Sequence, residues 1–95
     1  MKIFAGQSLL TLKLDTGTDV STATVKRILY KKPSGAQGAW DATSVEALTI
    51  LTYDVEDNDL DEQGHWRFQA YVEIGGLKGY GQVVTEHVQL SVNQQ

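Results

Sequence analysis

The stretch from His65 to Ile74 constrains the fold of this chain more than any other part of its sequence. Five apolar residues alternate here with five more polar ones, and a period of two places the two sets on opposite faces of a β-strand. The apolar set comprises Trp66, Phe68, Ala70, Val72 and Ile74. No helical period gathers these residues on one stripe. We therefore predict a central strand with one buried face.

Other segments carry the same signature of alternating apolar, β-branched or aromatic residues. They cover residues 10–14, 24–32, 38–43, 48–55 and 80–92. Turn residues separate them, as in Lys32–Gly35, where Pro33 presets one backbone dihedral and Gly35 relieves another. The glycine-rich stretch 75–81 predicts a mobile hairpin between the last two strands.

Six or seven short strands flanked by turns predict an all-β fold, a small antiparallel sandwich or barrel. Parallel layering is excluded because no connection is long enough for a crossover helix. Two connections, residues 15–22 and 54–63, resemble corners that change sheets, which favours the sandwich. Residues 43–51 form a passable helical window, although their β-branched continuation favours a strand. A single helical turn is expected within residues 58–63.

The length of 95 residues supports one domain, spanning residues 1–95 with a core over about residues 7–92. The chain has no cysteine, so disulfides, thiolate metal sites and cysteine nucleophiles are excluded. The first residues do not accumulate a signal-like apolar core, because Gly6, Gln7 and Ser8 interrupt them. We therefore expect synthesis in the cytoplasm without a leader.

The charge balance disfavours nucleic acid and membrane as partners. Eight basic residues face twelve acidic ones, a net charge of −4, whereas binding to nucleic acid relies on basic side chains that displace counterions. No apolar run is long enough to span a bilayer. Lys26, Arg27, Lys31 and Lys32 fall close together, and we interpret them as the solvated surface of a strand.

The acidic stretch from Asp54 to Glu62 resembles a calcium loop, with Asp57, Asp59 and Asp61 in alternation. Calcium loops of the helix–loop–helix type require glycine at the sixth position and glutamate at the twelfth, and neither is present here. We interpret the stretch as a solvated corner, with these three aspartates as the competing candidate for a metal site.

Catalytic patterns are absent from the sequence. His65 and His87 lie on different strands, where they share a face only if those strands pair, and a metal site needs three or four convergent ligands. No serine lies in a nucleophile elbow, and the glycines of residues 75–81 lack the spacing of a phosphate loop. We expect no enzymatic activity and no cofactor.

The polar face of the central strand is the candidate contact surface. It presents Arg67, Gln69, Tyr71 and Glu73, beside Tyr80 of the glycine-rich hairpin. A mixed polar and aromatic surface suits protein contact better than catalysis. Trp40 is interpreted as core or edge cover, with a sugar-stacking platform as the alternative.

The chain resembles the small immunoglobulin-like modules of tailed-phage and prophage virion proteins, in particular the amino-terminal domain of siphophage baseplate upper proteins. The likeness rests on Ala-Thr-Val at residues 23–25, Tyr-Lys-Lys-Pro-Ser-Gly at 30–35, Gly-Ala-Trp at 38–40, Asp-Leu-Asp-Glu-Gln-Gly-His-Trp at 59–66 and the strand at 68–73. It covers about residues 7–92. Baseplate proteins continue into a long region for receptor binding or trimerisation, whereas this sequence stops at residue 95.

This resemblance implies an immunoglobulin-like β-sandwich that serves as a structural module of a virion, in the tail, baseplate or head–tail region. Its partners would be other virion or prophage proteins, in a homo-oligomeric ring or a hetero-assembly. The alternative is a carbohydrate-binding or adhesin-type module that uses Trp40 and Tyr80, with calcium at the acidic corner.

Overall fold

The chain folds as two packed β-sheets. The computed structural model describes residues 3–4, 10–56 and 59–89, and these residues form nine strands and no helix. The strands are β1 (Ile3–Phe4), β2 (Thr11–Asp15), β3 (Val25–Lys31), β4 (Gln37–Asp41), β5 (Ser44–Glu46), β6 (Ile50–Asp54), β7 (Gly64–Ile74), β8 (Leu77–Tyr80) and β9 (Val84–Gln89). The number exceeds the six or seven expected because β1, β5 and β8 are short segments that the sequence pattern did not separate.

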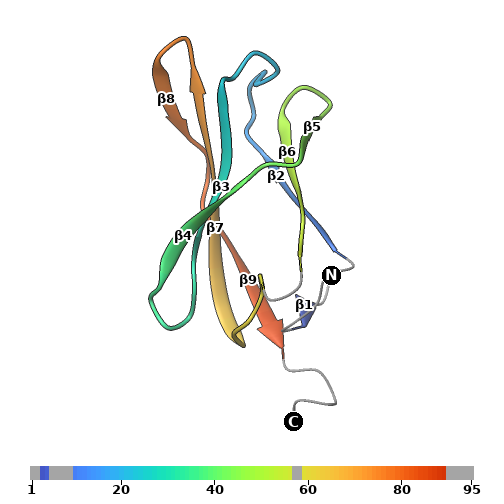
Figure 1. The fold of residues 1–95 in the computed structure, drawn as a ribbon, viewed down its shortest axis with the longest axis vertical. Coiled ribbons are helices and arrows are strands. Elements are labelled where there is room, and N and C mark those ends of the chain that lie inside the picture. The colour runs from blue at the N-terminus through green and yellow to red at the C-terminus, as the bar shows by residue number, and fades with distance from the viewer. Residues whose placement is uncertain (1–2, 5–9, 57–58, 90–95) are drawn as a thin grey trace.

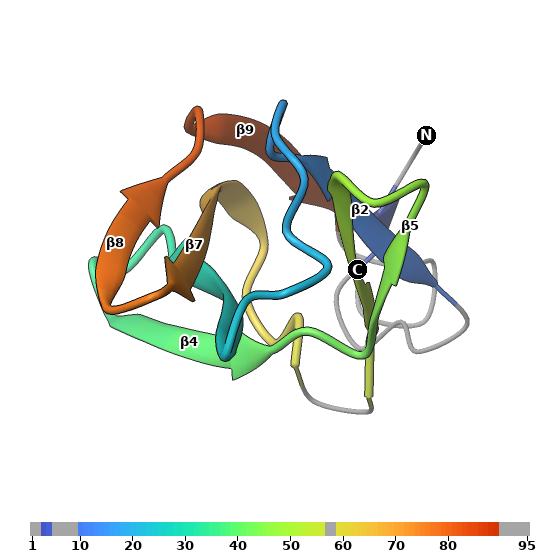
Figure 2. The ribbon, with the colours of Figure 1, turned by 90° about the horizontal axis from the view of Figure 1, so that it is seen from above.

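The larger sheet has the order β1-β9-β7-β3-β4, and β8 also pairs with β7. The smaller sheet has the order β2-β6-β5. All pairs are antiparallel except β1 with β9. Seen from above, β4, β7 and β8 lie on one side of the molecule and β2 and β5 on the other (Figure 2). The predicted antiparallel β-sandwich is therefore confirmed.

The buried face of β7 follows the alternation that the sequence predicts. Trp66, Phe68, Ala70 and Val72 are buried, and the Trp66 indole Nε1 donates a hydrogen bond to the Glu62 carbonyl at 2.9 Å. The core is completed from both sheets and from the connections by Leu12, Leu14, Val20, Ala23, Ile28, Leu51, Val55, Leu60 and Val88. Because β7 pairs with β3, β8 and β9, it is the central strand of the larger sheet (Figure 1).

The β3–β4 hairpin turns where proline and glycine predict it. The Gly35 amide donates to the Lys32 carbonyl at 2.9 Å, and Gly35 adopts a φ of 98°, which side chains disfavour. The hairpin then places Gly38 opposite Tyr30. A Cβ at Gly38 would lie 2.3 Å from the Tyr30 hydroxyl, so glycine makes room for the tyrosine ring.

Residues 43–51, the passable helical window, form a β-hairpin. β5 and β6 pair through Val45 and Leu51, and the turn between them contains Ala47 and Leu48, whose φ angles are 49° and 67°. The interpretation of this segment as strand is confirmed, although β6 begins at Ile50 rather than at Leu48.

The last strands return along one edge of β7 in two pieces. Tyr80 of β8 pairs with Tyr71, and Val84 of β9 pairs with Phe68. The three residues 81–83 therefore lie opposite only two residues of β7. The extra residue forms a β-bulge. The hairpin predicted in the glycine-rich stretch is thus formed by β7 and β8, and a bulge then leads into β9.

The corner between β6 and β7 holds no helix in its described part. Asp59 and Leu60 lie in a turn, closed by the Asp59 amide on the Glu56 carbonyl at 3.2 Å, so the helical turn expected within residues 58–63 is not formed at 59–63. The expected core limits of 7 and 92 lie outside the described residues.

Candidate functional site

The surface of the larger sheet that turns away from the smaller sheet is here named the outer face. By strand alternation it carries Arg67, Gln69, Tyr71 and Glu73 of β7. Tyr80 of β8 lies directly opposite Tyr71, so the structure brings together on one face all five residues that the sequence proposed for contact.

Tyr71 is less accessible than its position suggests. Only 8% of the residue is exposed, its ring centroid lies 5.1 Å from that of Tyr80, and its hydroxyl donates to Glu73 Oε2 at 2.6 Å. This hydrogen bond, together with burial, raises the pKa of Tyr71 to about 12. Tyr80, which is 63% exposed, is the aromatic side chain that a partner can reach.

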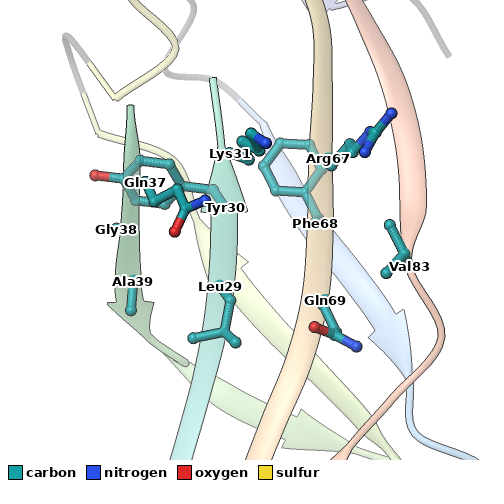
Figure 3. Close-up of a pocket in the computed structure, with 10 residues that line it drawn as sticks. All are labelled: Leu29, Tyr30, Lys31, Gln37, Gly38, Ala39, Arg67, Phe68, Gln69 and Val83. Atoms are coloured by element: carbon teal, nitrogen blue, oxygen red, sulfur yellow. The ribbon is translucent and has the colours of Figure 1, made fainter. Parts of the chain in front are cut away.

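The outer face is shallowly hollowed over its middle strands. An open hollow of about 550 Å³ lies over β4, β3 and β7 and reaches the bulge before β9 (Figure 3). The outward side chains that line it include Leu29, Lys31, Ala39, Arg67, Gln69 and Val83. Sequence reasoning found Arg67 and Gln69 but missed the others, because their neighbourhood depends on strand register.

One row of directly opposed residues crosses the hollow, and we name it the basic rung. It runs from Gln37 of β4 through Lys31 of β3 and Arg67 of β7 to Thr85 of β9. Figure 3 shows Lys31 and Arg67 leaving neighbouring strands at one end of the hollow, with Leu29 at the next level along the strand. The four cations that lie close together in the sequence are separated by strand alternation. Lys31 and Arg27 face outward, whereas Lys26 and Lys32 lie on the other side of β3.

His65 and His87 do share a face, because β7 and β9 pair with these two residues directly opposite. Their ring centroids are 4.9 Å apart. Among the described residues, however, no group of three or more histidine or carboxylate side chains is placed to hold a metal ion. A smaller hollow of about 210 Å³ separates His65 and Arg67 from the β3–β4 turn.

The acidic corner uses its carboxylates internally. Asp59 Oδ2 accepts hydrogen bonds from the Tyr53 hydroxyl at 2.6 Å and from the Glu56 amide at 2.7 Å, and burial together with the bond to Asp59 raises the pKa of Tyr53. Both Asp61 oxygens accept from Lys32 Nζ, at 2.9 and 3.0 Å, which raises the pKa of Lys32. Asp57, the third calcium candidate, lies outside the described residues.

Trp40 is not available as a sugar platform. Its ring stacks on Tyr30 at a centroid distance of 4.6 Å and on Tyr53 at 4.7 Å, and it packs against the core. The interpretation as core cover is confirmed, and of the two proposed stacking residues only Tyr80 presents an exposed ring.

Comparison with protein families, with curated proteins and with solved structures gave no match. In the part of the chain that the structure describes, no helix is long and apolar enough to cross a membrane. The function must therefore be inferred from the outer face itself.

Proposed function

We propose that this protein is a non-enzymatic assembly module that contacts other proteins through the outer face of its larger sheet, as a structural component of a phage or prophage virion. The observation that carries the contact is the open hollow of about 550 Å³ on the outer face. The hollow lies partly over β7, the central strand that the alternating sequence pattern predicts.

The composition of the surface around the hollow supports a protein partner. Leu29 and Val83 supply apolar area, and Val83 is 52% exposed. Arg67 lines the hollow, and Tyr80 stands beyond it with most of its ring exposed. Arginine and tyrosine are enriched at protein interfaces and at their energetic centres, so this mixture fits a contact surface.

The chemistry of the polar groups supports a contact role over a catalytic one. In the described part of the chain, every buried polar side-chain atom has a hydrogen-bond partner. The charged groups that line the hollow are Lys31 and Arg67, and the described residues of its lining include no histidine or carboxylate, the side chains that most often transfer protons in enzymes.

The virion setting rests on the sequence resemblance to immunoglobulin-like modules of tailed phages. Virion modules act through fixed contacts that symmetry repeats, and a heterologous contact of this kind forms a ring when its rotation closes. Other virion proteins, or further copies of this chain, are the partners that we propose.

The test is assembly of particles by an induced lysogen that encodes the chain. A double variant, Arg67→Glu with Tyr80→Ala, changes two exposed residues of the outer face. We expect mass spectrometry of purified particles to find the wild-type chain in them, and the double variant to be absent or the particles to be incomplete.

The matched control is Lys13→Glu with Leu77→Ala, which makes the same change of charge on the smaller sheet and also removes an exposed large side chain. The control is expected to assemble as the wild type does. Normal particles containing the Arg67→Glu, Tyr80→Ala variant would contradict the outer-face contact, and absence of the wild-type chain from particles would contradict the virion role.

A further inference from the structure

The basic rung brings two like charges together. Lys31 and Arg67 lie directly opposite each other on β3 and β7, where Cβ atoms are about 4.5–5.5 Å apart. Like charges placed opposite each other on one face of a sheet are destabilising. The fold therefore retains an energetically unfavourable arrangement at one end of its hollow.

No carboxylate among the described residues neutralises this pair. The ion pairs of the described part join Lys13 to Glu46, Arg27 to Asp41 and Lys32 to Asp61. Lys31 and Arg67 take part in none of them. Their long side chains leave adjacent strands, so both head groups can converge on one oxyanion, which would convert repulsion into two charge-assisted hydrogen bonds.

The surroundings of the rung restrict the ligand. Toward one end lie the paired imidazoles of His65 and His87, and toward the other lie the apolar side chains of Leu29 and Ala39, two residues along their strands. Two residues of an extended strand span about 6.6–6.8 Å. A ligand that fits has an anionic group and an apolar group at that separation.

We propose that the hollow binds an extended acidic segment of a partner protein, with one carboxylate held between Lys31 and Arg67 and an apolar side chain two residues away seated over Leu29. An extended chain presents residues i and i+2 on the same side at the required spacing. This inference rests on the proposed contact through the outer face and names the chemistry of the partner.

A nucleic acid or a sulfated glycan fits the surface less well. A polyanion needs a row of cations that neutralise successive charges. Beyond the apolar level, however, the cations of the outer face lie against carboxylates, because Arg27 is paired with Asp41 and Lys78 lies opposite Glu73. The chain as a whole has a net charge of −4. One carboxylate beside one apolar group matches the single basic rung.

The experiment titrates the full isotope-labelled chain with a short capped peptide in which aspartate and leucine are two positions apart, flanked by threonine. We expect amide shifts at residues 29, 31, 67 and 69 in nuclear magnetic resonance spectra. A peptide with asparagine in place of aspartate is expected to bind about tenfold more weakly, because a hydrogen bond to a charged group is lost.

Protein variants locate the site. Lys31→Gln and Arg67→Gln are each expected to weaken binding of the aspartate peptide about tenfold, whereas Lys13→Gln, on the smaller sheet, leaves it unchanged. Lys31→Gln is also expected to raise the melting temperature slightly, because it removes the repulsion from Arg67. This second measurement does not depend on the peptide.

Equal binding of the aspartate and asparagine peptides, shifts confined to other surfaces, or no shift at millimolar peptide would overturn the proposal. Tighter binding of heparin or single-stranded DNA than of the peptide at these residues would overturn it in favour of a polyanion. If the peptide fails to bind while Arg67→Glu with Tyr80→Ala still blocks particle assembly, the proposed function stands and only the acidic-segment inference fails.

Discussion

Tyr71 lies on the outer face, but its side chain is held by neighbouring residues of the protein itself. Its hydroxyl donates to Glu73 at 2.6 Å, and this bond is the main cause that raises the pKa of Tyr71 to about 12. We expect Glu73→Gln to lower the pKa of Tyr71, because the neutral amide places no negative charge beside the phenolate. The measurement is the pH dependence of phenolate absorbance, taken as the difference between each protein and its Tyr71→Phe counterpart.

The sign of the linked stability follows from the raised pKa of Tyr71. The folded protein favours the neutral phenol, so the stabilisation is complete below the ordinary tyrosine pKa of about 10 and is lost as the pH rises through about 12. Glu46→Gln, which removes a carboxylate of the smaller sheet, is the control and should leave the Tyr71 pKa unchanged. An unaltered Tyr71 titration in Glu73→Gln would show that burial alone causes the shift.

Leu48 is a residue under backbone strain. Its φ of 67° lies in the left-handed region, and its carbonyl is held by the Val20 amide at 2.8 Å. Because asparagine tolerates this conformation better than leucine, we expect Leu48→Asn to raise the free energy of unfolding by about 0.5–1 kcal/mol. Urea denaturation measures this gain in the free energy of unfolding.

The control is Leu77→Asn, which replaces another exposed leucine that has no positive φ. It is expected to give no gain in stability. An equal gain would attribute the effect of Leu48→Asn to surface polarity instead.

At the scale of elements, β7 could be predicted from the sequence in full, because its alternation survives over its whole length. β5 and β8 could not, since one is three residues long and the other consists largely of glycine-rich sequence. The sequence also could not predict which residues lie opposite each other on neighbouring strands. The pairing of Lys31 with Arg67, and hence the basic rung, depends on the register between β3 and β7, which are separated in the sequence by three other strands.

The bulge at residues 81–83 determines which face of β9 is buried. Its Gly81 amide donates to the Ala70 carbonyl and its Gly81 carbonyl accepts from the Gln69 side chain, both at 2.9 Å. A one-residue slip turns every side chain of a strand to the other face. We therefore expect deletion of Gln82 to expose Val88 and to abolish cooperative unfolding, as followed by circular dichroism during heating.

Insertion of one glycine between Gly75 and Gly76 is the control for the Gln82 deletion. It lengthens the exposed β7–β8 turn without touching the bulge, and lengthening a surface loop costs little. The inserted variant should unfold cooperatively near the wild-type temperature. A Gln82 deletion that also unfolds cooperatively would mean that β9 keeps its face by another adjustment.

At the scale of the whole molecule, charge is divided unevenly between the surfaces. The outer face carries Arg27, Lys31, Arg67 and Lys78 against Asp41 and Glu73, a balance of 4 − 2 = +2, whereas the chain as a whole has −4. Composition alone indicates only the overall sign of the charge. The local reversal emerges only when strand alternation and sheet order are combined.

The two sheets are joined by an aromatic stack as well as by aliphatic packing. Trp40 of β4 belongs to the larger sheet and Tyr53 of β6 to the smaller, and their rings lie 4.7 Å apart at an interplanar angle of 7°. We expect a double-mutant cycle of Trp40→Leu and Tyr53→Leu, measured by urea denaturation, to give a coupling energy of about 0.5–1.5 kcal/mol. The same cycle on Trp40 and Tyr80, two rings that make no stacking contact with each other in the structure, should be additive within about 0.5 kcal/mol. Additivity of Trp40 with Tyr53 would assign the joining of the sheets to the aliphatic core alone.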